Sequence, residues 1–152
     1  MFTEQGFKPE SSAPIGVFDS GVGGLTVARE IMRQMPNEKI IYFGDTARVP
    51  YGSKSKDTVT RFSKQILHFL QTFDVKTIVV ACNTASAYAL EELEKECDIP
   101  IICVIKPGAK VASEVTRNGK IGVIATEATI SSGIYTQYIK EMNENVTVYG
   151  KA

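Results

Sequence analysis

The sequence has no excess of charge of either sign, because its 17 Lys and Arg residues are balanced by 17 Asp and Glu residues. A chain without net charge lacks the long-range field that draws proteins to nucleic acids or anionic membranes. It also has no apolar run long enough to cross a bilayer. We therefore predict no nucleic-acid partner and no membrane association. Residues 1–12 are polar, unlike a signal peptide, and we expect them to form a disordered tail.

Histidine and cysteine are also scarce. Cys82, Cys97 and Cys103 form no C-x-x-C pair and lack zinc-ligand spacing, so no metal site is predicted. An odd number of thiols without a secretion signal is typical of the reducing cytoplasm. The one histidine, His68, falls off the apolar face of its predicted helix. No Cys–His catalytic pair is therefore expected.

Short apolar runs alternate with helix-forming segments along the whole chain. The runs cover residues 15–18, 39–43, 77–81, 101–105, 120–125 and 146–149. This alternation predicts an α/β fold with a parallel-rich, doubly wound sheet. We place a first α/β domain at residues 13–105 and an incomplete second α/β domain at residues 106–152. The last two strands are expected to lack part of their apolar cover, and one helix is predicted over residues 130–142.

The most informative stretch surrounds Cys82. The β-branched run at 77–81 predicts a strand buried on both faces, and polar Cys82, Asn83 and Thr84 follow it directly. Ligands bind at the carboxyl ends of such strands, and the amino end of the following helix favours a thiolate. A small buried cysteine is the alternative. The polar neighbours, which need partners, favour a site.

A glycine-rich turn follows the first predicted strand and begins with Asp19 and Ser20. It does not fit a dinucleotide fingerprint, because Thr26 stands where the third glycine belongs, and no G-K-[ST] follows for a phosphate loop. The glycines alone fit a tight strand-to-helix turn. A carboxylate at the same sheet edge as Cys82 can, however, act as a base or orient one.

Thr126 repeats the position of Cys82, just after an apolar run, and Thr129 lies one turn further on. Helix capping by Thr129 and ligand contact are equally supported and compatible.

Cys97 ends a helix and Cys103 is placed inside a strand, so both are predicted to be structural thiols.

Three motifs in this order resemble the glutamate racemases of the aspartate/glutamate racemase superfamily: FDSGVGGL at 18–25, GDTARVPYG at 44–52 and ACNTA at 81–85. Residues 106–109 and the two threonines give weaker support. The resemblance runs from residue 15 to the end of the sequence. It implies interconversion of L- and D-glutamate without cofactor or metal, by two cysteines on opposite faces of the α-carbon. It also implies that the D-isomer enters peptidoglycan.

The resemblance assigns proton removal to Cys82 and an assisting role to Asp19. It implies substrate contacts for Ser20, Tyr51, Gly52, Asn83, Thr84, Thr126 and Thr129. The family's second cysteine lies in a Cys-Thr-His motif that this sequence does not contain, so full racemisation by these residues alone is not expected. Glutamate is the expected partner, and a homo-oligomer is left open. The alternative is a catalytically inactive α/β protein of the same fold that binds a small acidic ligand or a protein partner.

Overall fold

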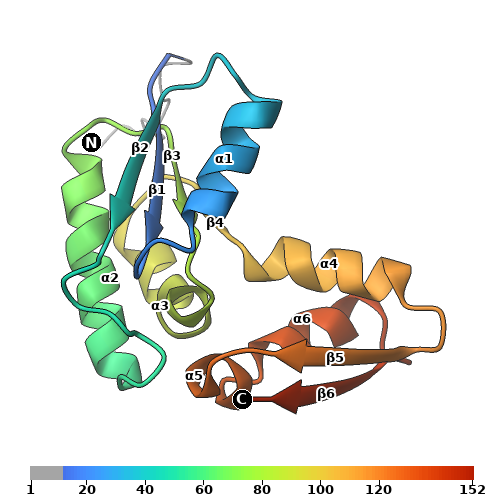
Figure 1. Cartoon of the computed structure of the whole chain (residues 1–152). Helices are drawn as coiled ribbons and strands as arrows, with labels where there is room; N and C mark the ends of the chain where they lie inside the picture. Colours follow the sequence, from blue (N-terminus) through green and yellow to red (C-terminus); the bar gives the residue numbers. More distant parts are fainter. Residues whose placement is uncertain (1–11) are drawn as a thin grey trace, which may run out of the picture.

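The computed structural model describes residues 12–152, so all but the last residue of the predicted tail lies outside the described residues. Strands and helices alternate as predicted (Figure 1). The elements are β1 (Ile15–Asp19), α1 (Leu25–Gln34), β2 (Ile40–Gly44), α2 (Lys56–Gln71), β3 (Thr77–Val80), α3 (Asn83–Glu96), β4 (Ile101–Cys103), α4 (Ile105–Val115), β5 (Lys120–Ile124), α5 (Glu127–Ser131), α6 (Ile134–Met142) and β6 (Thr147–Lys151). Every strand pair is parallel, which confirms the predicted fold class.

The larger sheet has the strand order β2-β1-β3-β4. Successive side chains of a strand point to opposite faces, and the two central strands bury both sets. Phe18 and Val80 face a core shared with α2 and α3, whereas Val17 and Val79 pack against residues of α1. The helices therefore cover both faces of this sheet (Figure 1). This packing fixes the strand ends on which the candidate site is built.

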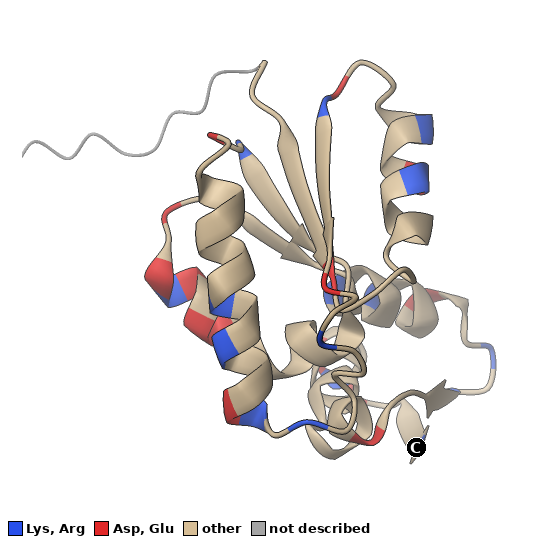
Figure 2. Cartoon of the chain, turned by 60° about the vertical axis from the view of Figure 1, so that its left-hand side comes forward, with Lys and Arg blue, Asp and Glu red and all other residues tan. Residues whose placement is uncertain are grey.

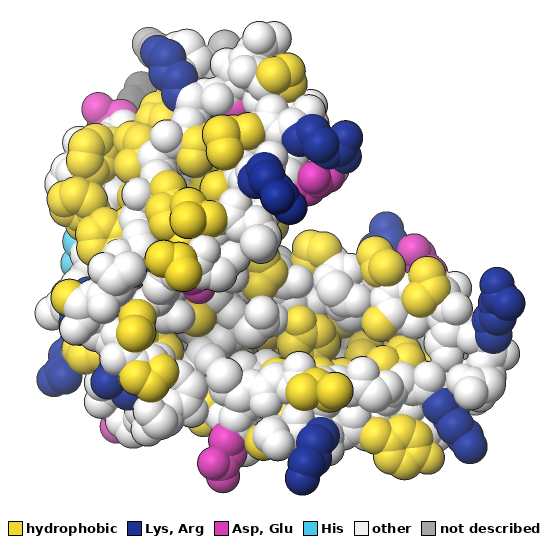
Figure 3. Space-filling view, in the orientation of Figure 1, with side chains coloured by type: hydrophobic (Ala, Val, Ile, Leu, Met, Phe, Trp, Pro, Cys, Tyr) yellow, Lys and Arg dark blue, Asp and Glu magenta, His cyan; other side chains and the backbone are white. Residues whose placement is uncertain are grey.

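The smaller sheet contains only β5 and β6. Helix α4 runs from the larger sheet toward it, and α6 packs along α4 (Figure 1). The predicted loss of cover holds for Ile121, Val123 and Val148, which are half-buried. It is wrong for Val146, which is only 3% exposed because it packs with residues of α4 and α6. Figure 3 shows apolar side chains at the surface between α4 and these strands.

Two local predictions need correction. The helix expected over residues 130–142 is two helices, because Gly133 between α5 and α6 has a φ of 70°, a left-handed conformation that glycine adopts readily. Cys103 is the last residue of β4 rather than an interior one. In α2, Phe69 is 45% exposed and its ring packs at a tilt against that of Phe43 in β2, whereas Leu67 is fully buried.

Lys and Arg residues alternate with Asp and Glu residues along the elements of the chain (Figure 2). This distribution agrees with the balanced composition of 17 basic and 17 acidic residues. Within residues 12–152, none of the helices has the length and apolar character needed to span a membrane. The domain boundary near residue 105 stays a prediction. Ile105 itself is fully buried in the core of the larger sheet.

Candidate functional site

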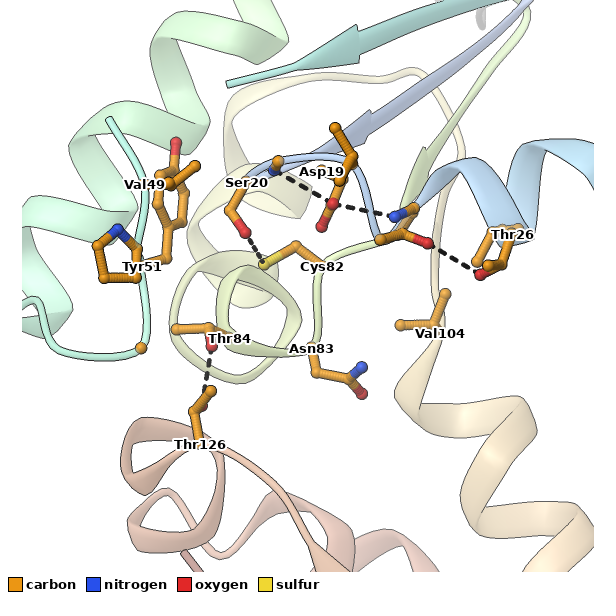
Figure 4. A pocket seen from close by; sticks show the side chains of 18 residues that line it. Asp19, Ser20, Thr26, Val49, Tyr51, Cys82, Asn83, Thr84, Val104 and Thr126 are labelled. Atoms are coloured by element: carbon orange, nitrogen blue, oxygen red, sulfur yellow. Dashed lines mark hydrogen bonds between the residues drawn. The ribbon is translucent and has the colours of Figure 1, made fainter. Parts of the chain in front are cut away.

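A cavity of about 540 Å³ opens at the carboxyl edge of the larger sheet (Figure 4). Asp19 ends β1 there, and Cys82 follows β3 as the residue that caps α3. Adjacent parallel strands bring their carboxyl ends to the same edge, which is why residues 63 positions apart meet. The cavity wall includes Asp19, Ser20, Tyr51, Gly52, Cys82, Asn83, Thr84 and Thr126. The structure thus brings these predicted residues together, while their roles stay predictions.

Thr129 does not line this cavity. It is 1% exposed within α5, and its hydroxyl lies 3.1 Å from that of Thr126. The predicted cap is also reversed, because the backbone N–H of Thr129 donates to the Thr126 side chain at 3.4 Å. Thr129 lines a neighbouring cavity of about 460 Å³, to which Asn83 and Thr126 also contribute. Thr129 is thus connected to the cavity that contains Cys82 by its hydrogen bonds with Thr126.

Cys82 is 5% exposed at the inner end of the cavity. Its sulfur accepts the backbone N–H of Ala85 at 3.4 Å and lies 3.4 Å from Ser20 Oγ (Figure 4). Burial raises the pKa of the thiol and outweighs its hydrogen bonds with Ser20 and with the Ala85 backbone N–H, which lower the pKa. The Asp19 charge raises the pKa further. Burial thus outweighs the helix amino end and the local donors, and the expectation that they make Cys82 a thiolate is wrong.

The carboxylate of Asp19 also holds the glycine-rich turn by hydrogen bonds. Its Oδ2 accepts the backbone N–H groups of Gly21 at 3.1 Å and Gly24 at 2.9 Å. Turn amides of this kind bind phosphates in other proteins, but here a carboxylate of the chain already pairs with them. This pairing supports the prediction that the turn is a tight strand-to-helix turn and not a nucleotide fingerprint. The turn also places Asp19 in the wall of the cavity, close enough for its charge to act on Cys82.

The loop after β2 carries Tyr51 and Gly52 to the opposite wall. The hydroxyl of buried Tyr51 donates to the carboxylate of Asp45, which is itself 4% exposed. Arg48 Nε lies 2.7 Å from the same oxygen, and its guanidinium stands 4.2 Å from the ring centroid of Phe62. Burial and the Asp45 hydrogen bond raise the pKa of Tyr51, so its hydroxyl stays protonated. Sequence reasoning missed Asp45 and Arg48, although they form an i, i+3 charge pair within the quoted motif.

Residues 106–152 reach the cavity by three contacts. The hydroxyls of Thr84 and Thr126 lie 3.0 Å apart. Gly52 lies so close to Thr126 that an added Cβ would stand 2.7 Å from its Cγ2. Tyr135 of α6 donates its hydroxyl to Asn83 Oδ1 at 2.8 Å. No motif marked Tyr135, because its partner is 52 positions away in the sequence.

The other two cysteines lie elsewhere. Cys103 is 4% exposed and packs in the core of the larger sheet, and Cys97 is half-buried beyond the end of α3. Neither lines the cavity. Residues 12–152 contain no group of three His, Cys, Asp or Glu side chains arranged to hold a metal ion. Cys82 is thus the one thiol at the site in the described part of the chain.

This α/β protein has a polar cavity at the carboxyl ends of its parallel strands, with a buried cysteine and a helix amino end in the wall, which is where open α/β sheets bind small ligands. The sequence profile of the Asp/Glu/Hydantoin racemase family matches residues 15–152, and the chain belongs to this family. It is 58% identical over 138 residues to a glutamate racemase from Geobacter metallireducens. That match covers 91% of this chain and 51% of the relative.

Solved structures agree with this assignment. A glutamate racemase isoform from Bacillus anthracis superposes with a TM-score of 0.90 at 48% identity, over 93% of this chain and 53% of that one. The glutamate racemase from Francisella tularensis, solved in complex with D-glutamate, gives a TM-score of 0.85 at 46% identity, over 91% and 52%. The chain spans about half the length of the curated relatives that it matches.

Proposed function

We propose that these residues are the amino-terminal portion of a cytoplasmic glutamate racemase, which interconverts L- and D-glutamate and supplies the D-isomer for peptidoglycan. The observation that carries this proposal is the placement of Cys82 in a cavity walled by hydroxyl, amide and carboxylate groups. Relatives that are 52–58% identical are glutamate racemases, and one similar structure contains D-glutamate. In this proposal no cofactor takes part.

Recognition of glutamate would use the groups around the amino end of α3. Asn83 and Thr84 occupy its first turn, where unpaired backbone N–H groups and the helix dipole favour a carboxylate. Ser20 offers a hydroxyl from the facing turn, and Asp19 offers the only carboxylate in the cavity wall for a substrate ammonium. The described residues thus present donors for the anionic part of the substrate and an acceptor for its cationic part.

The proton step would depend on that ammonium group. A positive charge entering beside Cys82 lowers the pKa of the thiol and so opposes the effect of burial, which raises it. The thiol then loses its proton to solvent, and the thiolate takes the α-proton of the substrate. The electron pair of the broken C–H bond stays on the substrate, where the donors around its carboxylate stabilise it. Cys82 can return the proton to the same face of the carbon.

Inversion of the α-carbon needs a second acid on the opposite face of the substrate. The thiols around the cavity bear on this need and favour a second candidate function. Cys97 and Cys103 do not line the cavity, so the described residues offer one thiol only. By themselves these residues would bind glutamate and exchange its α-proton without racemising it. A binding protein without turnover is the limiting case, in which even the exchange is absent.

Exchange of the α-proton with solvent distinguishes these functions. In D2O, proton NMR should show loss of the α-proton signal of one glutamate enantiomer, while polarimetry shows no change in optical rotation. Cys82→Ser should abolish the exchange and Cys97→Ser should retain it. Glutamate binding without exchange would favour the binding protein. A chain that neither binds glutamate nor exchanges its α-proton would contradict the racemase proposal.

A further inference from the structure

The side chain of Asn83 can present two chemically different groups to the cavity. Its carboxamide has an NH2 group that donates two hydrogen bonds and an oxygen that only accepts them. Asn83 is the first residue of α3, and its side chain is exposed at the cavity wall. Rotation by half a turn would exchange donor for acceptor. The orientation of this amide therefore decides whether the site attracts or repels a carboxylate.

Tyr135 fixes that orientation from the other part of the molecule. Its hydroxyl donates to Asn83 Oδ1 at 2.8 Å, which is the only side-chain hydrogen bond of Asn83 within residues 12–152. With the oxygen engaged, the NH2 group remains for the cavity. In Figure 4 the Asn83 nitrogen lies on the upper side of the amide, the side of Cys82 and Val104, and the oxygen lies on the lower side.

The phenol is itself held in one place and in one protonation state. The ring of Tyr135 packs against the core of the larger sheet and against the core of the smaller one. Its hydroxyl also lies beside Gly108 of α4, where an added Cβ would stand 3.5 Å from the oxygen. Burial, and to a lesser extent the nearby Cys103, raise the pKa of Tyr135, so the hydroxyl remains a donor at neutral pH.

We propose that Tyr135 is a positioning residue: its hydroxyl engages Asn83 Oδ1, so that the amide N–H groups of Asn83 face the cavity and donate to a carboxylate of the ligand. The identity of that ligand as glutamate rests on the function proposed above. The hydrogen bond and the orientation that it imposes on the Asn83 amide are independent of that function. Tyr135 need not touch the ligand, since it acts through Asn83.

The chain provides a matched control on the same helix. Tyr138 is half-buried and packs against the same two cores as Tyr135. Its ring lies 5.4 Å from Lys106 Nζ, but its hydroxyl makes no hydrogen bond with the described residues. Tyr135→Phe and Tyr138→Phe therefore remove the same atom from similar surroundings, and only the first change releases Asn83.

The first measurement reads the Asn83 amide directly. In the 15N-labelled chain, its NH2 signals are assigned by their loss in Asn83→Ala. Tyr135→Phe should shift these signals toward those of a free amide and should increase the mobility of the Asn83 side chain. Tyr138→Phe should leave the chemical shifts and the mobility unchanged. Unchanged Asn83 signals in Tyr135→Phe would overturn the proposal, whether or not the chain binds glutamate.

The second measurement reads the consequence for the ligand. Tyr135→Phe should weaken glutamate binding about tenfold, because the released Asn83 amide no longer donates reliably to the charged carboxylate, and Tyr138→Phe should change binding by no more than about twofold. In the Asn83→Ala background Tyr135→Phe should cause no further loss, because the two residues act as one unit. A full additional loss there would overturn the inference. Absence of binding by the wild-type chain would contradict the proposed function, and the amide signals would still decide the role of Tyr135.

Discussion

The two parts of the molecule bury their strands to very different extents. All five residues of β1 are buried, whereas β5 alternates between exposed and half-buried residues. Ile124 at the end of β5 is 88% exposed, although it precedes the cavity residue Thr126 by only two positions. The larger sheet has helices on both faces, as parallel sheets normally require, and the smaller sheet lacks part of that cover.

The two parts of the molecule also contribute different groups to the candidate site. The groups that can move a proton or hold a charge, Cys82 and Asp19, stand on the well-packed sheet, where their positions are fixed. The less covered part contributes hydroxyls, through Thr126 to Thr84 and through Tyr135 to Asn83. Reactive groups thus lie on the rigid element, and the other part adjusts the residues beside them.

The largest expected effect is the loss of unfolding free energy when a core side chain is shortened, and it should differ between the two cores. Leu70 is fully buried in the core of the larger sheet, and Ile121 is half-buried in the smaller one. Leu70→Ala should cost about 2–5 kcal/mol of unfolding free energy, because it leaves a cavity in a closely packed core. Ile121→Ala should cost clearly less, because less of its surface leaves water on folding. Urea unfolding followed by circular dichroism measures both.

Hydrogen exchange tests the same comparison without a mutation. Amides of β1 and β3 should exchange much more slowly than those of β5 and β6, since poorly covered segments open at lower free energy. Equal protection of the two sheets, or equal losses for Leu70→Ala and Ile121→Ala, would show that the smaller sheet is as stable as the larger one.

The next largest effect is expected from a substitution that disrupts the contact between Gly52 and Thr126, which joins the two parts. In Gly52→Ala the new Cβ would stand 2.7 Å from Thr126 Cγ2 and 2.8 Å from Thr126 Cβ, so the loop or α5 must move. Such overpacking typically costs about 1–3 kcal/mol. We expect changed NMR shifts for Thr84 and Thr126, whose hydroxyls would separate. Gly21→Ala in the same cavity wall meets only Val49 at 3.5 Å and serves as the control. Similar shifts in both variants would contradict the contact.

A smaller effect concerns a polar defect in the well-packed part. The hydroxyl of Ser63 in α2 is fully buried and has no hydrogen-bond partner among residues 12–152. Ser63→Ala should raise the unfolding free energy by about 1 kcal/mol, because it removes an unpaired polar atom. Ser86→Ala should lower it by a similar amount, since the Ser86 hydroxyl donates to the Val80 carbonyl at 3.2 Å. A loss of stability in both variants would mean that Ser63 has a partner after all.

The sequence was sufficient for features that depend on local pattern. The β-branched run before Cys82 and the polar residues after it predict a buried strand and its end, and parallel pairing then brings Asp19 and Cys82 to one edge. Elements of the smaller sheet were predicted in type, although the helix break at Gly133 was not. A glycine inside an apolar helical pattern does not by itself reveal a positive φ.

Features that depend on tertiary contact were not predictable. The partners Tyr135 and Asn83 are joined only by the packing of α6 on α3 and α4, which no periodicity encodes. The thiol of Cys82 was misjudged for a related reason. Helix position and neighbouring donors can be read from the sequence, but the burial that dominates the pKa is a property of the assembled cavity.

The smallest expected effect concerns that thiol and tests the electrostatics of the well-packed part. Because burial raises the pKa of Cys82, its alkylation in the unliganded chain should increase only at a higher pH than for a free cysteine, whose pKa is about 8.5. Ser20→Ala should move the profile to still higher pH, since the Ser20 hydrogen bond lowers the pKa. Thr26→Ala is the control, because the Thr26 hydroxyl also belongs to the cavity wall but bonds to Gly23. Site-resolved mass spectrometry across a pH series measures each profile, and a Cys82 profile at or below that of a free thiol would show that the hydrogen bonds outweigh burial.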